Sequence, residues 1–111
     1  MNRKEIERKL MCMGFLAGNK GFGYIAEVME HIHKDGGNIQ KITVTYQEIA
    51  EKYGVACGTI ERCIRHEIRC YYDQGSRHPL LADGVKGRTR LTNREFLARL
   101  YWIMCNEEKR G

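Results

Sequence analysis

The fold of this chain is decided by residues 46–72, which read YQEIAEKYGVACGTIERCIRHEIRCYY. Ala50 stands where two helices must approach closely, and Gly54 follows four residues later, where the turn between them belongs. A small residue permits a close crossing, and glycine accepts the positive φ of a tight turn. Three apolar residues are spaced to fill the angle between the helices: Ile49, Val55 and Ile60. This spacing predicts a helix-turn-helix motif over about residues 46–73.

The second helix of the motif sorts into two faces when it is wound at about 100° per residue. One arc is apolar and predicts the core side: Ile60, Cys63, Ile64, Ile68, Cys70 and Tyr71. The opposite face is polar and rich in arginine: Gly58, Thr59, Arg62, Arg65, His66 and Arg69. Guanidinium groups match the O6/N7 edge of guanine and also phosphate oxygens. The pattern therefore favours double-stranded DNA as the partner, with the helix of about residues 58–73 in a major groove. The alternative is a solvated face on which Glu61 and Glu67 neutralise the arginines.

Two residues fit this helix poorly. Glu67 falls inside the apolar arc, so we expect it to be paired, to lie at the edge of the core, or to face a second subunit. Ala56 stands where Ser or Thr normally caps a recognition helix. The helix start is therefore expected to fray or to move toward Cys57.

The composition limits the class of protein. A chain of 111 residues, 42% of them hydrophobic, is enough for one core, so we expect a single domain over residues 1–111. The formal net charge of +5 favours an anionic partner without identifying it. No apolar run approaches the roughly 18 residues that cross a bilayer, and residues 1–10 lack the apolar stretch of a signal peptide. We therefore expect a cytoplasmic protein without membrane contact.

The five cysteines are odd in number and lack the CxxC pairs of structural zinc sites, so reduced thiols are expected. Cys63, His66 and Cys70 have a helical spacing that could bring three metal ligands together. The two cysteines fall on the apolar arc, however, where free cysteine behaves as a small hydrophobic residue. No metal site and no cofactor are predicted.

Glycines and capping residues mark the other helices. A first helix is predicted from Arg3 to Met13 with a stop at Gly14, and a second from about Asn19 as N-cap to Lys34, ended by Gly36 and Gly37. Two capping boxes begin two more helices, a short one to Tyr53 and one that closes the chain: Thr45 with Glu48, and Thr92 with Glu95.

Two segments are predicted to lack helix. Residues 39–45 are mostly β-branched and, with no partner strand, are expected to form an extended linker. Residues 75–91 should hold a short helical turn at 79–82 and then a basic loop. Three cations of this loop are expected to contact phosphate: Lys86, Arg88 and Arg90. The chain is thus predicted to be all-α, a winged-helix-like bundle of about five to six helices without a clear β wing.

Several strings of residues support a family resemblance: Ile6-x3-Leu10 before Gly14, Lys20-Gly21-Phe22-x-Tyr24, Ile49-Ala50, Ile60-Glu61-Arg62-x-Ile64-Arg65-His66-x-Ile68, Gly75, and Thr92-Asn93-x-Glu95-Phe96. From Ile6 to Phe96 the chain resembles the DNA-binding effector domain of the sporulation-initiation response regulator (stage 0 sporulation protein A) of endospore-forming bacteria, a six-helix fold. The resemblance implies sequence-specific transcription regulation by dimers on tandem or inverted sites. It implies that Glu61 and Arg62 reach base edges, while Arg65 and His66 contact the backbone or neighbouring bases.

The chain also departs from the family. Gly58 and Thr59 stand where related domains have serine and then arginine, and a missing bidentate arginine removes roughly 1–3 kcal/mol of discrimination. A relaxed or different site is expected. The segment 75–92 looks shorter than in the family, which puts a fifth helix and any dimer contact built on it in doubt. The family's phospho-receiver domain does not precede residue 1, so we expect no switching by aspartyl phosphorylation in cis if this chain is the whole protein.

A second hypothesis is a protein-interaction module that keeps the fold and modulates a related full-length regulator by heterodimerisation, without reading DNA. Thr59 in place of arginine and Glu67 in the apolar arc favour it. An enzyme is not predicted, because Glu61 and His66 are separated by about 140° around the helix axis and no glycine loop forms a pocket beside them.

Overall fold

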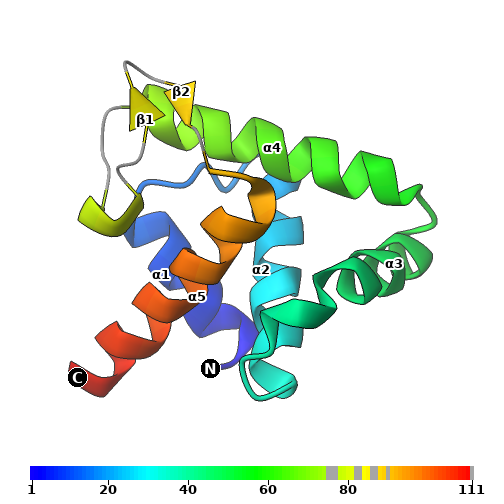
Figure 1. The fold of residues 1–111 in the computed structure, drawn as a ribbon, viewed down its shortest axis with the longest axis horizontal. Helices are drawn as coiled ribbons and strands as arrows, with labels where there is room; N and C mark the ends of the chain where they lie inside the picture. The colour runs from blue at the N-terminus through cyan, green and yellow to red at the C-terminus, as the bar shows by residue number, and fades with distance from the viewer. Residues whose placement is uncertain (75–77, 82–83, 86–87, 90, 111) are drawn as a thin grey trace.

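The chain forms five α-helices in the part that the computed structural model describes, namely residues 1–74, 78–81, 84–85, 88–89 and 91–110 (Figure 1). In chain order the elements are α1 (Arg3–Cys12), α2 (Lys20–Lys34), η1 (Ile39–Lys41), α3 (Ile42–Tyr53), α4 (Cys57–Asp73), η2 (Pro79–Leu81), β1 (Gly84–Val85), β2 (Arg88–Thr89) and α5 (Asn93–Arg110). The predicted all-α class is confirmed.

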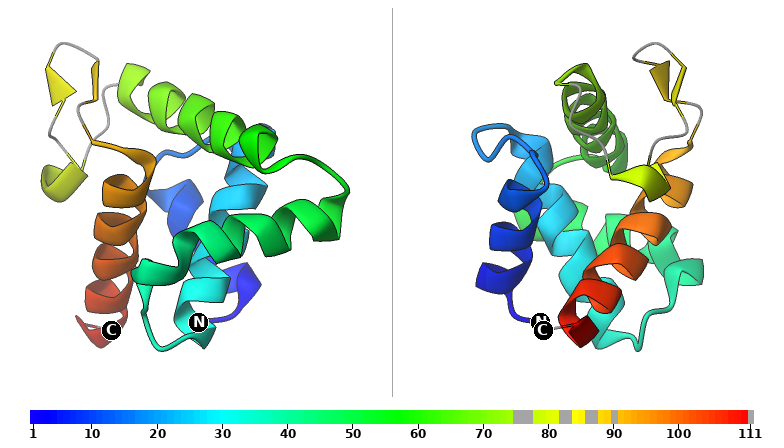
Figure 2. Two further views of the ribbon diagram at one scale, coloured as in Figure 1. Left: turned by 45° about the vertical axis from the view of Figure 1, so that its right-hand side comes forward. Right: turned by 90° about the vertical axis from the view of Figure 1, so that its left-hand side faces the viewer.

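Helix α2 runs through the middle of the molecule and contacts each of the other four α-helices (Figure 1). Its buried positions recur at helical spacing: Ile25, Val28, Met29 and Ile32 are at most 1% exposed. Helix α4 lies across the end of the bundle where α2 begins, and Figure 2 shows this arrangement from two further sides. One long face of α4 is thereby left uncovered by the other α-helices.

Gly21 sets how closely α2 and α4 approach. A Cβ atom built at this position would lie 2.2 Å from the carbonyl oxygen of Cys63 and 2.7 Å from Cβ of Glu67. Real Cβ atoms do not approach backbone atoms this closely, so any larger residue would push the two helices apart. Within the string Lys20-Gly21-Phe22, glycine is therefore required at position 21 for α4 to pack where it does.

The predicted linker at residues 39–45 was wrong. This segment is a turn of 3-10 helix followed by the first turn of α3, and Thr45 lies inside the helix rather than at its cap. Four side chains at helical spacing are buried and outweigh the β preference of the run: Ile42, Thr45, Tyr46 and Ile49. The hydroxyl of Thr45 donates to the carbonyl of Lys41 at 3.3 Å, and Glu48 pairs with His31 at 3.2 Å, so no capping box forms there.

The basic loop contains a short antiparallel ladder that the sequence did not reveal. Gly84 pairs with Thr89 and Val85 with Arg88, and strand β2 lies against α4. Figure 2 shows this hairpin beside the C-terminal end of α4. The short helical turn expected before it is present as η2. A hairpin of two residues per strand leaves no periodic signal for sequence analysis to detect.

A buried carboxylate, Glu27, joins α1, α2 and α3. It is 2% exposed, and three groups lie within 3.0 Å of its oxygens: Nζ of Lys52 at 2.6 Å, the hydroxyl of Tyr53 at 2.7 Å and Nη1 of Arg3 at 3.0 Å. Burial alone would raise the pKa of Glu27, but hydrogen bonds from Lys52, Tyr53 and Arg3 outweigh it and lower this pKa to about 2. The ionised carboxylate thus holds the three N-terminal helices together.

We expect Gly21→Ala to destabilise the fold by about 1–3 kcal/mol, because the overlap with Cys63 exceeds the gain of about 1 kcal/mol in helix propensity. Gly23→Ala in the same helix is the matched control, since its Cβ would meet only Nη2 of Arg3 at 3.8 Å among the described residues. Thermal unfolding should show a lower Tm for Gly21→Ala and an equal or higher Tm for Gly23→Ala. Equal effects of the two changes would contradict the close crossing.

Acid should weaken the protein partly through Glu27. A folded pKa lowered from 4.5 to about 2 contributes stability that is present above pH 4.5 and is lost as the pH falls toward 2. Because Lys52 is more than half exposed, solvent screens the pair, and we expect a contribution on the order of 2 kcal/mol. Urea unfolding between pH 7 and pH 2 should give a shallower pH dependence for Glu27→Gln than for the wild type. Parallel curves would rule out this role.

Candidate nucleic-acid interface

The turn between α3 and α4 has the predicted geometry. Gly54 ends α3 with φ of 66° and ψ of 35°, the left-handed region that glycine adopts without strain. The backbone N–H of Val55 then donates to the carbonyl of Ala50 at 3.0 Å, which closes the helix end. Ala50, Ile49 and Ile60 are buried between the two helices, so the helix-turn-helix spacing is confirmed.

Helix α4 is anchored by one apolar face. Five of its large apolar or aromatic residues are at most 1% exposed: Ile60, Ile64, Ile68, Tyr71 and Tyr72. Cys63 and Cys70, predicted on this face, lie at its margins and are half-buried. The helix begins at Cys57 after Ala56, which provides no side-chain cap, as expected from the sequence.

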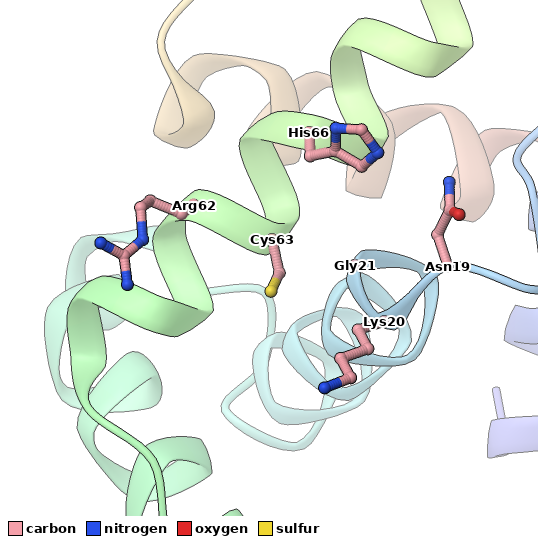
Figure 3. A pocket seen from close by; sticks show the side chains of 6 residues that line it. All are labelled: Asn19, Lys20, Gly21, Arg62, Cys63 and His66. Carbon is pink, nitrogen blue, oxygen red and sulfur yellow. The ribbon is translucent and has the colours of Figure 1, made fainter.

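The exposed face of α4 carries most of the predicted contact residues. Gly58, Glu61, Arg62, His66 and Arg69 are exposed, and Thr59 is half-buried. Arg62 makes only a long contact among the described residues, with Nη2 3.4 Å from the hydroxyl of Thr59. Figure 3 shows Arg62 and His66 on successive turns of α4 with Cys63 between them; the ring of His66 extends toward Asn19 at the start of α2, whereas the guanidinium of Arg62 is directed away from α2.

Arg65 has a structural position that the sequence analysis missed. Its Nη1 donates to the carbonyl of Leu91 at 2.8 Å and lies 3.4 Å from Oδ1 of Asn93. Asn93 in turn donates from Nδ2 to the carbonyl of Glu61 at 3.1 Å. These bonds tie the middle of α4 to the start of α5. Every residue has a backbone carbonyl group, so residue types do not reveal which carbonyl accepts a hydrogen bond. The string Thr92-Asn93 was the only sequence feature that pointed to this contact.

The start of α5 is held by the predicted capping box. The N–H of Glu95 donates to the hydroxyl of Thr92 at 3.1 Å, and the N–H of Thr92 donates to Oε1 of Glu95 at 3.2 Å. The hydrogen bond from the backbone of Thr92, followed by that from its hydroxyl, lowers the pKa of Glu95. The partner of Arg65 is therefore presented by a fixed helix end.

Glu67 is paired within the chain, which is one of the three outcomes expected for it. The side chain is 0% exposed and accepts hydrogen bonds from the N–H of Leu16 at 2.7 Å and from Nδ2 of Asn19 at 2.9 Å. Asn19 occupies the N-cap position of α2 as predicted, but its side chain does not cap the helix. The carboxylate instead links α4 to the segment between α1 and α2.

Tyr46 lies under the N-terminal half of the interface. Its hydroxyl is buried and, among the described residues, has no hydrogen-bond partner. Burial, followed by the negative charge of Glu61, raises the pKa of Tyr46 to about 12. The hydroxyl is therefore neutral at physiological pH and adds no charge beside Glu61.

The predicted phosphate contacts of the basic loop fall largely outside the description. Lys86 and Arg90 lie outside the described residues, and Arg88 is described only as a backbone position of β2. Their role stays a prediction.

In the described part of the chain, no three His, Cys, Asp or Glu residues are arranged to hold a metal ion, although Nε2 of His66 lies 3.5 Å from Sγ of Cys70. Among the described helices, none has the length and apolar character that crossing a membrane requires.

The chain also matches a known family. The model of the family described as "Sporulation initiation factor Spo0A C terminal" matches residues 6–103 of the chain. The match spans α1 through most of α5 and includes the whole helix-turn-helix.

Arg65 and Arg69 should differ in their effect on stability. We expect Arg65→Ala to lower the free energy of unfolding by about 1 kcal/mol, since it removes the hydrogen bonds to Leu91 and Asn93. Arg69→Ala, one turn further along the exposed face, should change it by less than about 0.5 kcal/mol. Urea unfolding measures both. A loss for Arg69→Ala as large as that for Arg65→Ala would be incompatible with the assigned contacts.

Proposed function

Because the chain belongs to the family of the C-terminal domain of sporulation initiation factor Spo0A, a DNA-binding effector domain, we propose that it is a transcriptional regulator that reads double-stranded DNA with α4. The single observation that carries this proposal is the division of α4 into a buried apolar face and an exposed face with Arg62, His66 and Arg69. A helix of this kind fits a major groove, which is about 12 Å wide.

The contacts around α4 support a recognition role because they hold the helix from two sides. Glu67 links it to the segment before α2, and Arg65 links it to the start of α5. A helix fixed in this way loses little conformational freedom when it enters a groove. Arg65 then acts mainly as a positioning residue in this proposal, and Arg62 is the guanidinium best placed for a bidentate contact with guanine.

The first turn of α4 offers a close approach for DNA. Gly58 is exposed, and a Cβ added there would meet no described atom within 4 Å. Thr59 and Glu61 follow it in the same turn of the helix, so hydroxyl and carboxylate groups are available for base edges near Arg62. Arg69 is proposed to contact phosphate, and Lys86, Arg88 and Arg90 are proposed to contact the backbone beyond the end of α4.

The alternative interaction module loses one of its two supports. Glu67 is satisfied inside the chain and does not need a second subunit. Thr59 in place of arginine still favours weaker base reading. Trp102 is 56% exposed on α5 beside Leu80 and Arg99, and this is the apolar surface that a protein partner would use. Heterodimerisation with a related regulator therefore remains the second candidate.

The proposal is tested by selecting bound duplexes from a random library and measuring affinity for a selected and a random duplex over a range of salt concentrations. We expect log K to fall with log salt by about 0.9 for each phosphate neutralised. Arg62→Ala should bring the affinity for the selected duplex close to that for the random one, a loss of about 1–3 kcal/mol of discrimination.

Lys4→Ala is a control for this test, because Lys4 lies exposed on α1. It should keep the preference for the selected duplex. Selection that returns no common sequence, combined with equal affinities for all duplexes in the wild type, would exclude base reading and leave the interaction module.

A further inference from the structure

A cleft lies between the first turn of α2 and the exposed side of α4. It has a volume of about 300 Å³ and is lined by Asn19, Lys20, Gly21, Arg62, Cys63 and His66 (Figure 3). The side chains of Lys20, Arg62 and His66 are exposed. Two elements distant in sequence thus contribute Lys20, Arg62 and His66 to the lining of one cleft, although the guanidinium of Arg62 is directed away from α2 (Figure 3). Lys20 is the residue of these three that lies outside the helix-turn-helix.

The cleft has a fixed width because its floor is a helix crossing. Gly21 lies against the backbone of Cys63 so closely that no Cβ could be added. Beside it, Glu67 binds Asn19 and the N–H of Leu16, which holds the segment leading into α2. Lys20 is therefore kept at the same cleft as Arg62 and His66 by packing that involves none of the three.

The charges around the cleft favour an anion. Lys20 and Arg62 each carry a full positive charge, and an imidazole N–H of His66 can donate a hydrogen bond. None of the described residues that line the cleft is acidic. The carboxylate of Glu67, on α4 beside Gly21, is buried and accepts two hydrogen bonds from within the chain. A phosphate oxygen accepts from all three donor types, and lysine binds phosphate as a compact point charge.

We propose that this cleft binds one phosphate of the DNA backbone, with Lys20 as a contact residue outside the helix-turn-helix. The inference rests on the proposed function. A helix with its side chains is about 10–12 Å across and fills the major groove, so the two DNA strands pass along its sides. Lys20 lies on one such side, at the point where α2 crosses α4. The contact sets the register of α4 in the groove without reading sequence.

The test compares Lys20→Gln with Lys34→Gln. Both changes remove one positive charge from the same helix, and Lys34 lies exposed at its other end. Affinity for a selected and a random duplex is measured against salt concentration. Lys20→Gln should reduce the magnitude of the salt slope by about 1 and weaken binding to both duplexes by the same factor. Lys34→Gln should keep the wild-type slope, and equal Tm values would show that both variants fold.

The outcomes separate the two claims. If the wild type prefers its selected duplex but Lys20→Gln and Lys34→Gln have the same slope, the cleft does not bind phosphate and the proposed function stands. If the wild type binds no duplex, both claims fail.

A scan with neutral methylphosphonates locates the contact. Neutralising the phosphate at one backbone position should weaken DNA binding by the wild type and leave DNA binding by Lys20→Gln unchanged. A scan in which every position weakens both proteins equally would overturn the proposal.

Discussion

The contact between Gly21 on α2 and Cys63 on α4 is the constraint on which the rest of the structure depends. Because no side chain separates the two backbones, α4 is held across the end of the bundle. The buried carboxylate of Glu67 strengthens this contact from within the apolar face of α4. Unpaired, such a group would cost several kcal/mol, so its two hydrogen bonds to the segment before α2 are needed for the fold. This arrangement leaves the opposite face of α4 exposed.

The arginines of α4 divide into two kinds. Arg65 is half-buried and bonded to the start of α5, whereas Arg62 and Arg69 are exposed. Side chains that hold a recognition helix in place need hydrogen-bond partners within the free protein. Side chains that contact the ligand must instead be exposed, so that they can exchange bound water for DNA. The capping box at Thr92 completes the support of Arg65. A sequence pattern that groups all arginines on one stripe cannot make this distinction.

Local signals explain which parts of the structure could be predicted. The turn at Gly54, the apolar face of α4 and the capping box at Thr92 involve residues within a few positions of one another, so their chemistry is visible in the sequence. The start of α3 at Ile42 was not predicted. The burial of side chains in this segment outweighs their β preference, and burial depends on helices that are distant in the sequence. The pairing of Glu67 with Asn19 and of Arg65 with Leu91 joins residues far apart in the chain. For Glu67 the sequence indicated pairing as one of three outcomes, and for Arg65 it indicated no partner within the chain.

The same distinction applies to the candidate site. Residues on the exposed face of α4 were predictable from helical periodicity, but Lys20 was not, because its place beside Arg62 results from the crossing of α2 and α4. The helical spacing of Cys63, His66 and Cys70 brings Nε2 of His66 to 3.5 Å from Sγ of Cys70. The two thiols lie half-buried at the margins of the core.

The central claim is that DNA meets the outward face of α4. It is tested most directly by adding a selected duplex to the isotope-labelled protein and following its backbone amide signals by NMR. The account predicts that the largest shifts occur at Gly58 to His66 and at the first turn of α2. Shifts confined to the region of Trp102 on α5, with α4 unchanged, would contradict it.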